Sequence, residues 1–364
     1  MGLRGTTPIR ALDDLTPPTE VTLRGRLTHV AGASALLADE GGSIELTLAE
    51  GAGGRPAPGA WVRVTGTFDG RVVRCAQAEV LASPARPFFP PAGEWLCLHG
   101  DDGRVLSNLR RRARVLRAIR AFFEARAFLE VATPVAVPSP GLDLHLDAAG
   151  VTGLAAAPRW LITSPEYQMK RLLAGGLERI YQIGPCARRG EHGPLHEPEF
   201  TMLEWYRAFA GSDEIMRDTE ALVAAVGETL HGRPVLPGRG RPVDVTPPWP
   251  RLTVADAFAR FAGAPLDEVL PDETRFYRLF VERVEPHLGH PEPVFLTHWP
   301  ATMASLARLH PDDPRFADRV EAYVDGVELC NGFGELVDPV EQRARLERDR
   351  AARVEAGLEP YPVD

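Results

Sequence analysis

The sequence has almost no lysine, few cysteines and no long apolar run. Lys170 is the only lysine among 364 residues, so arginine supplies nearly all of the positive charge. The four cysteines, Cys75, Cys97, Cys186 and Cys330, are too scattered for a disulfide framework or a paired-cysteine zinc site. No uncharged stretch approaches the roughly 20 apolar residues that a membrane-spanning helix needs. We therefore expect a cytoplasmic protein with no membrane partner.

Positive charge is also scarce overall. The formal net charge is -9, whereas sequence-independent binding to nucleic acid depends on Lys and Arg contacts with phosphates. A hydrophobic content of 44% and a charged content of 25% exclude a disordered chain and are enough for two or three compact domains. Any nucleic-acid site must therefore be local.

Residues 1–83 have the pattern of a small all-β domain. Turn signals such as Asp69-Gly70 separate five short segments of β-branched or alternating residues. The predicted strands are residues 21–27, 34–37, 44–48, 61–66 and 72–80. This spacing favours a closed five-stranded barrel of the OB type, which leaves no long strand edge exposed. Because Trp61 and Phe68 are its only aromatic residues, the sequence leaves nucleic-acid binding by this domain open.

The rest of the chain predicts a linker and a larger domain. Residues 84–104 are rich in proline and predict a semi-rigid linker. Residues 105–364 predict an α+β domain, an antiparallel sheet flanked by helices, which begins with an amphipathic helix capped by Ser107 or Asn108. The arginine-rich face of this helix is either a solvated surface or a docking surface for an acidic partner or RNA.

A second helix is clearly delimited. Ser164 fits its N-cap, Pro165 its first turn and Gly175 its end. Glu166 at the helix start has two interpretations: it complements the positive end of the helix, or it meets an ammonium group of a ligand.

Alternation over residues 199–206 predicts a strand with one apolar face and one mixed face. The mixed face carries Phe200, Met202, Glu204 and Tyr206. A carboxylate between aromatic rings packs poorly in a core but suits the wall of a pocket for a cationic or aromatic ligand. Arg188 in the preceding loop is a candidate phosphate clamp.

A two-residue hairpin turn at Asp325-Gly326 predicts a further carboxylate cluster. Continuous pairing sets Glu321 opposite Cys330 and makes Glu321 and Glu328 diagonal neighbours that can share a cation. Isolated carboxylates on a sheet are usually exposed, so this interpretation depends on the rest of the chain.

These residues together indicate an enzyme that activates an amino acid with ATP. The mixed face supplies aromatic rings for a base, Arg188 suits a phosphate, and the carboxylate pair suits a divalent metal. Glu335, which follows a strand loosened by two glycines, adds a carboxylate for an amine.

The sequence resembles class II aminoacyl-tRNA synthetases of the lysyl branch. The likeness covers about residues 105–364 and depends on residues 128–134, which look like motif 1, and residues 188–206, which look like motif 2. Residues 163–172 and 326–336 fit the same branch. The Glu204-Trp205-Tyr206 run is similar to the paralogue that attaches lysine or β-lysine to elongation factor P, whereas the barrel is similar to true lysyl-tRNA synthetase. We expect the elongation factor P ligase; the alternatives are lysyl-tRNA synthetase acting on tRNA and a catalytically dead binding module.

The resemblance implies a role for each candidate site residue. The substrate-binding residues would be Ser164, Glu166, Tyr206 and Glu335, with Glu166 on the α-amine and Glu335 on the side-chain amine. The ATP-binding residues would be Arg188, His196, Phe200, Glu328 and Leu329. Arg188 would act catalytically on the α-phosphate, Phe200 would stack on adenine, and Glu321 and Glu328 would carry Mg²⁺. Motif 1 implies a homodimer.

Three departures from the family pattern stand out. The family's Arg-Asn-Glu reads Arg188-Arg189-Gly190 here, and Glu197 stands where the family has an asparagine. The sequence ends at Asp364, before the family's motif 3 and its ATP-clamping arginine. The resemblance therefore implies a C-terminally incomplete catalytic domain that adenylates poorly until motif 3 is restored.

Overall fold

The computed structural model describes residues 5–49, 56–85, 104–304 and 306–364. The chain divides into two compact units, Met1–Ala113 and Arg114–Asp364, and each is described by itself. Most of the segment predicted as a linker, residues 84–104, lies outside the described residues. Within the described ranges, no helix has the length and apolar character needed to cross a membrane.

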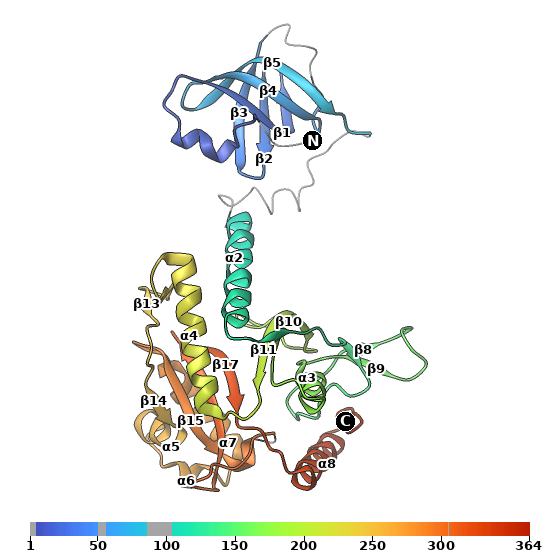
Figure 1. Ribbon diagram of the computed structural model, residues 1–364, viewed down its shortest axis with the longest axis vertical. Coiled ribbons are helices and arrows are strands. Elements are labelled where there is room, and N and C mark those ends of the chain that lie inside the picture. The colour runs from blue at the N-terminus through green and yellow to red at the C-terminus, as the bar shows by residue number, and fades with distance from the viewer. Residues whose placement is uncertain (1–4, 50–55, 86–103, 305) are drawn as a thin grey trace. The chain divides into compact units, whose positions relative to one another are not determined.

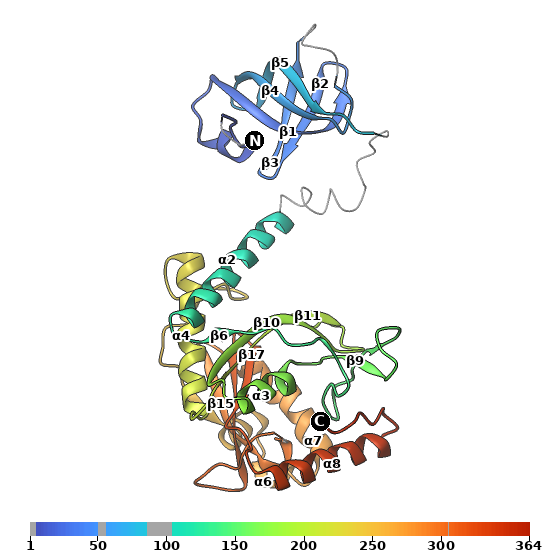
Figure 2. The same ribbon diagram turned by 45° about the vertical axis from the view of Figure 1, so that its right-hand side comes forward.

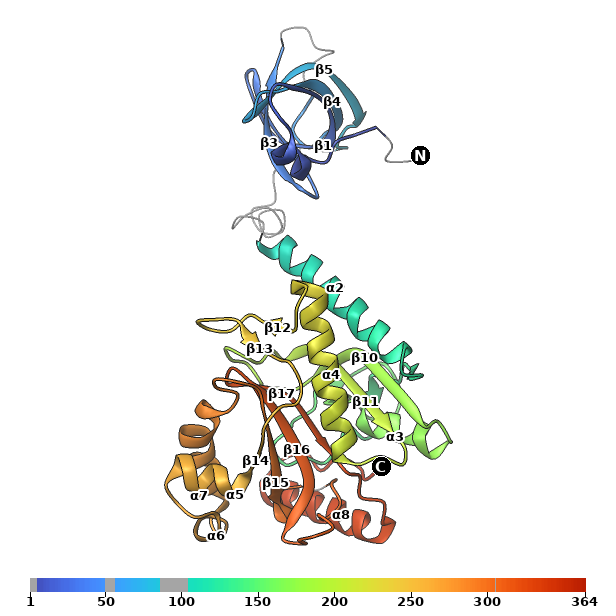
Figure 3. The same ribbon diagram turned by 60° about the vertical axis from the view of Figure 1, so that its left-hand side comes forward.

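The first unit contains a closed five-stranded barrel (Figures 1 and 3). Its strands are β1 (Thr19–Ala31), β2 (Ser34–Asp39), β3 (Gly42–Leu48), β4 (Trp61–Phe68) and β5 (Val72–Ala82). They are joined in the order β1-β2-β3-β5-β4, and β3 and β5 run parallel. Alternation along β1 buries Val21, Leu23 and Leu27, and the short helix η1 (Ile9–Asp14) adds Ile9 and Leu12 to the same core. All five predicted strands are present, each longer than predicted.

Two larger sheets organise the second unit. One has the order β11-β10-β6 and the other the order β14-β15-β16-β17. Their strands are β6 (Leu129–Glu130), β10 (Arg179–Ala187), β11 (Glu199–Arg207), β14 (Arg251–Thr253), β15 (Val294–Pro300), β16 (Phe316–Val324) and β17 (Val327–Phe333). Most strand pairs of this unit are antiparallel, as expected, but the β6–β10 and β14–β15 pairs are parallel. Both pairs have long connections, and those connections permit parallel pairing.

Short strands and helices surround these sheets. Two small sheets contain β7 (Ala136–Val137), β8 (Gly150–Val151) and β9 (Arg159–Leu161), and β12 (Val235–Leu236) and β13 (Val243–Asp244). The α-helices are α2 (Arg104–Glu124), α3 (Glu166–Ala174), α4 (Ser212–His231), α5 (Val254–Ala257), α6 (Leu266–Val269), α7 (Glu273–Leu279) and α8 (Pro339–Glu355). The remaining helical turns are η3 (Phe258–Ala262), η4 (Phe280–Val284), η5 (Glu285–His287) and η6 (Ala301–Met303). Figure 3 shows α4 running along β16 and β17, which it contacts.

Two predicted helix starts differ from the structure. Ser107 and Asn108 lie inside α2, so neither caps it, because Val105 and Leu106 before them extend the helix without a break. Helix α3 begins one residue later than predicted, with Pro165 as the N-cap residue. Ser164 still caps the helix chemically, since its Oγ accepts the Glu166 N–H at 3.2 Å.

The last turn of α8 and the segment after it hold the loop that connects β7 with β8. Arg353 is fully buried and donates to the carbonyls of Asp143 and Leu146 at 2.6 and 2.8 Å. The Tyr361 ring packs edge-on against Trp160 of β9 at 5.3 Å, close to where Figure 2 marks the C-terminus. These contacts hold the β7–β8 loop and β9 against α8 and the segment after it.

Candidate active site

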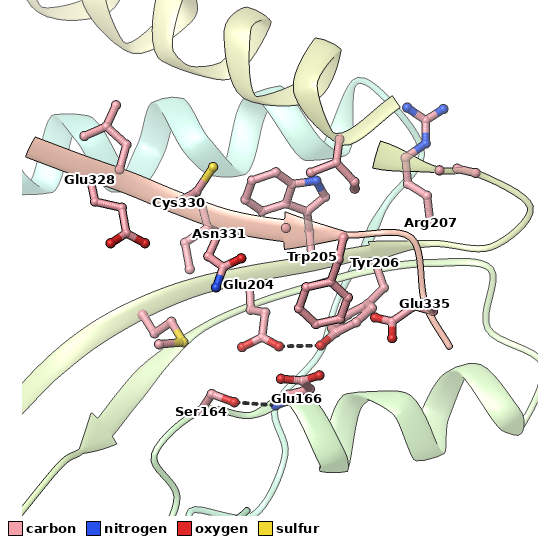
Figure 4. A pocket seen from close by; sticks show the side chains of 18 of the residues that line it. Ser164, Glu166, Glu204, Trp205, Tyr206, Arg207, Glu328, Cys330, Asn331 and Glu335 are labelled. Atoms are coloured by element: carbon pink, nitrogen blue, oxygen red, sulfur yellow. Dashed lines mark hydrogen bonds between the residues drawn. The ribbon is translucent and has the colours of Figure 1, made fainter. Parts of the chain in front are cut away.

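A cavity of about 350 Å³ opens between the β10–β11 hairpin and β17. Both strands place chemically active side chains on it: Glu204 and Tyr206 from β11, and Glu328 from β17 (Figure 4). Leu203 and Trp205 pack into the core behind β11, as the alternation predicts, although parts of both also line the cavity. The strand is therefore fixed by its apolar face and presents its mixed face to a ligand.

Three carboxyl groups meet at one end of this cavity, which we call the amine end. They belong to Glu166 at the start of α3, Glu204 on β11 and Glu335 just after β17. Figure 4 shows them grouped around Tyr206, whose hydroxyl donates to Glu204 Oε1 at 2.5 Å. The structure brings together Ser164, Glu166, Tyr206 and Glu335, which were all predicted for the substrate.

The crowding of these carboxyl groups disfavours their charged forms. Burial, together with the charge of Glu166, raises the pKa of Glu204 to about 8. Burial and Glu166 also raise the pKa of Glu335 to about 7, against the opposing effect of Lys170. A cation that binds among such carboxylates offsets their mutual repulsion. Raised pKa values of carboxyl groups in a cleft therefore indicate a site that favours a cation.

Lys170 is the residue that sequence reasoning missed at this end. Its Nζ lies 2.6 Å from Glu166 Oε1 and 2.6 Å from Glu335 Oε2. The signal was present, because Lys170 is the only lysine and stands four residues after Glu166, one helical turn away. Its contact with Glu335 spans distant parts of the chain and leaves no local pattern.

Close backbone packing fixes the position of Glu335. The N–H of Gly334 donates to the Asp318 carbonyl at 2.8 Å, and the Arg308 N–H donates to the Gly334 carbonyl at 2.8 Å. The Arg308 guanidinium in turn bonds Asp318 at 2.8 Å. A Cβ at position 334 would lie 2.1 Å from Asp318 Oδ2, so any other residue requires this ion pair or the backbone to move.

The other end of the cavity carries an arginine, and we call it the phosphate end. Arg188, Glu328 and Leu329 line it, whereas Phe200 and His196, also predicted for ATP, are not among the described lining residues. Phe200 lies beside the site, with its ring 5.2 Å from the Arg188 guanidinium. His196 is exposed in the loop between β10 and β11.

The predicted metal pair is only partly as expected. A bulge at Leu329 pairs Ala322 with Cys330 and Glu321 with Asn331, so the predicted pairing of Glu321 with Cys330 is wrong. Glu321 is buried, accepting from Arg319 at 2.8 Å and from the Tyr323 hydroxyl at 2.7 Å.

Glu321 and Glu328 remain close enough to affect each other. The surrounding protein and the Glu321 charge raise the pKa of Glu328 to about 8. The described residues include no group of three or more His, Cys, Asp and Glu side chains suited to a metal ion. Mg²⁺ is nevertheless commonly bound by one or two carboxylates when substrate phosphates supply the other ligands. Glu328 lines the cavity, and a metal ion there would need Glu321 to exchange one of its two hydrogen bonds for the metal.

The fold and the cavity together have the features of a class II synthetase-like catalytic domain. The motif 2 hairpin is β10–β11, its arginine is Arg188, and the acidic amine end faces the same cavity. A family model described as "tRNA synthetases class II (D, K and N)" matches residues 96–359, and the chain belongs to this family of synthetase-like ligases.

Curated relatives narrow the likeness. The chain is 40% identical over 275 residues to a protein of Proteus mirabilis named elongation factor P--(R)-beta-lysine ligase, covering 71% of this chain and 82% of that one. Relatives with the same name in Vibrio cholerae and Edwardsiella ictaluri are 38% and 41% identical, covering 71% of this chain and 83% and 82% of theirs. The predicted resemblance to the ligase paralogue within the lysyl branch is confirmed.

Proposed function

We propose that this protein activates (R)-β-lysine or lysine with ATP and transfers the acyl group to a lysine side chain of elongation factor P. The observation that carries the proposal is a single cavity with three carboxyl groups at one end and Arg188 with Glu328 at the other. The names of the curated relatives support the substrates and the acceptor. The reaction requires the carboxylate of the diamino acid to lie in line with the α-phosphate of ATP. The amine end would hold the amino acid and the phosphate end would hold ATP in the same cavity.

The amine end accounts for the choice of amino acid. Two ammonium groups on one ligand match the carboxylates of Glu166 and Glu335, which lie near Tyr206 in Figure 4. We assign the α- or β-amine to Glu166 and the terminal amine to Glu335, with Ser164 and the Tyr206 hydroxyl completing the pocket. Charge-assisted hydrogen bonds of this kind are strong where water is excluded.

The phosphate end accounts for activation. Arg188 would contact the α-phosphate and offset the charge that develops on phosphorus, while Phe200 and His196 would flank the nucleotide. Glu321 and Glu328 would hold Mg²⁺, which when bound neutralises the phosphate oxygens. Leu329 lies in β17 and would contact the nucleotide through its backbone.

The chemical steps follow from this arrangement. A carboxylate oxygen of the amino acid forms a bond to the α-phosphorus, and the bond to the β-phosphate oxygen breaks, which gives an aminoacyl-adenylate and pyrophosphate. The acceptor amine then attacks the acyl carbon and loses a proton, and AMP leaves. The residues act by positioning both reactants rather than by forming a covalent intermediate.

The proposal extends to the domains. We assign residues 1–83 to an OB-type barrel, residues 84–104 to a linker and residues 105–364 to the catalytic domain. The closed order β1-β2-β3-β5-β4 supports the OB assignment. A homodimer through motif 1 is supported by two exposed apolar side chains, Leu129 within the motif at 53% and Val135 directly after it at 41%.

The test is a transfer assay with stoichiometric protein, so that one turnover is enough for detection. The chain is mixed with ATP, Mg²⁺ and (R)-β-lysine or lysine, with either elongation factor P or lysine tRNA as acceptor. We expect the intact mass of elongation factor P to rise by one acyl group, and the tRNA to stay uncharged.

Each other outcome identifies an alternative. Charging of tRNA without modification of elongation factor P would identify a lysyl-tRNA synthetase. Calorimetric binding of the diamino acid with transfer to neither acceptor would identify a binding module. The role of the phosphate end is tested with Arg188→Met, which should abolish transfer. The matched control is Arg343→Met, which changes an exposed arginine on α8.

A further inference from the structure

Lys170 contacts the amine end from outside the cavity. Glu166 and Glu335 are among the described residues that line the cavity, and Lys170 is not. Its ammonium nevertheless bridges one oxygen of each carboxylate at 2.6 Å. The lysine thus holds the two carboxylates without occupying the place of a substrate.

The segment that carries Lys170 is rigid. The neighbouring residue Met169 is fully buried in a cluster with Ile180 and Tyr206, so α3 is anchored against the β10–β11 hairpin. The Lys170 Nζ also lies 5.3 Å from the Phe333 ring, just before the turn to Glu335. The ammonium therefore links α3 to the end of β17 at one fixed separation.

Among the described residues, titratable groups from three parts of the chain surround Lys170. Glu166 faces it from α3, Glu204 and Tyr206 from β11, and Glu335 from the segment after β17. Of the arginines that line the cavity, Arg188 lies at the phosphate end, and Arg207 is bonded to Asp218 through two hydrogen bonds of 3.0 Å.

We propose that Lys170 is a positioning residue that holds Glu166 and Glu335 in place and sets the charge of the amine end to match a ligand with two ammonium groups. The inference rests on the proposed function. With all three carboxylates ionised, the cluster including Lys170 carries a charge of two negative units, which two ammonium groups neutralise. A ligand with one ammonium group leaves one carboxylate to take up a proton.

Removal of the Lys170 charge has a defined effect on pH dependence. Without the lysine, three carboxylates face one another uncompensated, and the pKa values of Glu204 and Glu335, which Lys170 lowers, rise further. Ammonium binding needs ionised carboxylates, so the pH range over which affinity increases must shift upward. A purely structural role would weaken binding equally at every pH.

The experiment is a calorimetric titration of lysine into three variants between pH 6 and 9. Lys170→Met removes the charge and keeps the chain length, and Lys170→Arg keeps the charge. Arg171→Met is the matched control, because Arg171 is the next residue of α3 and pairs with Asp364. We expect Lys170→Met to lose at least about tenfold in affinity at pH 7 and to shift the rising part of the profile to higher pH. Lys170→Arg and Arg171→Met should keep the profile of the unaltered protein.

The single lysine allows a second, spectroscopic readout. Protein labelled with ¹⁵N at lysine Nζ gives one side-chain signal, that of Lys170. We expect a protected ammonium signal in the free protein that stays protected when lysine of natural abundance binds. Release of this signal to that of a solvent-exposed ammonium on binding would show that Lys170 competes with the substrate, and would overturn the proposal.

The remaining outcomes separate this inference from the function it rests on. If the unaltered protein binds neither lysine nor β-lysine, the proposed function itself fails. If that protein binds them and Lys170→Met binds equally or more tightly with an unchanged pH profile, only the role of Lys170 is wrong. Loss of binding at all pH values in both Lys170 variants would show a structural role and would also contradict the proposal.

Discussion

At the amine end, Lys170 forms ion pairs with Glu166 and Glu335, and its charge also lowers the pKa of Glu204. Three carboxyl groups thus depend on one cation of the protein. Each carboxylate was placed there by a different local rule: a helix start, an alternating strand and a glycine-loosened strand end. Their joint effect on pKa values arises only in the folded chain. The consequences can be tested one residue at a time.

Glu335→Gln should weaken binding of lysine or β-lysine while leaving ATP affinity unchanged. The carboxylate is expected to meet an ammonium group in a partly desolvated cavity. Its replacement by a neutral amide should cost on the order of 2 to 4 kcal/mol of binding free energy, or roughly 30- to 1000-fold in affinity. Calorimetric titration measures both affinities. The matched control is Glu347→Gln, an exposed carboxylate on α8. Equal lysine affinity in the two variants would remove Glu335 from the site.

The affinity for lysine should rise with pH through the neutral range. The pKa values of Glu335 and Glu204 are about 7 and about 8 in the empty cavity, and ammonium groups bind the ionised forms. The association constant should therefore increase from pH 6 to about pH 8, while the side-chain amine, with an ordinary pKa of about 10.4, stays charged. In Glu204→Gln the upper part of this rise should disappear. A flat profile in the unaltered protein would contradict the assignment of the carboxylates.

At the scale of elements, the exit of β17 determines where Glu335 points. Gly334→Ala places a Cβ 2.1 Å from Asp318 Oδ2 and 2.6 Å from Arg308 Nε, so that ion pair or the backbone must move. We expect a loss of lysine affinity of about tenfold or more with a smaller effect on ATP. Gly240→Ala, where a Cβ meets nothing within 4 Å, is the matched control. Unchanged lysine affinity in Gly334→Ala would show that this close packing does not position Glu335.

The elements were predictable where the pattern was local. The alternation over residues 199–206 predicted both the strand β11 and the face that lines the cavity, because one face had to enter the core with Leu203 and Trp205. The pairing of Glu321 failed because a bulge at Leu329 adds one residue to β17, and a bulge leaves no mark in the hydrophobic pattern.

Contacts between segments far apart in the chain could not be predicted from local sequence patterns. Two parallel strand pairs, β6–β10 and β14–β15, depend on how distant segments return to the same sheet. The same holds for the bridge from Lys170 to Glu335. The three carboxylates could be foreseen as candidates, but neither the contacts of Lys170 nor the raised pKa values of Glu204 and Glu335 could be.

At the scale of the whole molecule, exposed apolar side chains in motif 1 and directly after it predict association of two copies. We expect sedimentation to show a dimer at micromolar concentration, since symmetric pairing covers Leu129 and Val135. Leu129→Asp should give a monomer. The control Leu154→Asp changes a leucine that is 63% exposed outside motif 1, and should leave the dimer intact. A monomeric unaltered protein would contradict the prediction.

The central claim is that the cavity binds a diamino acid through both of its ammonium groups. The most direct measurement is a calorimetric titration at pH 8 that compares (R)-β-lysine and lysine with norleucine, which has an aliphatic side chain without the terminal ammonium. We predict that norleucine binds at least about a hundredfold more weakly than either diamino acid, because the Glu335 carboxylate is left without a partner. Equal affinities for norleucine and lysine would show that Glu335 does not bind the terminal amine, and would contradict the account.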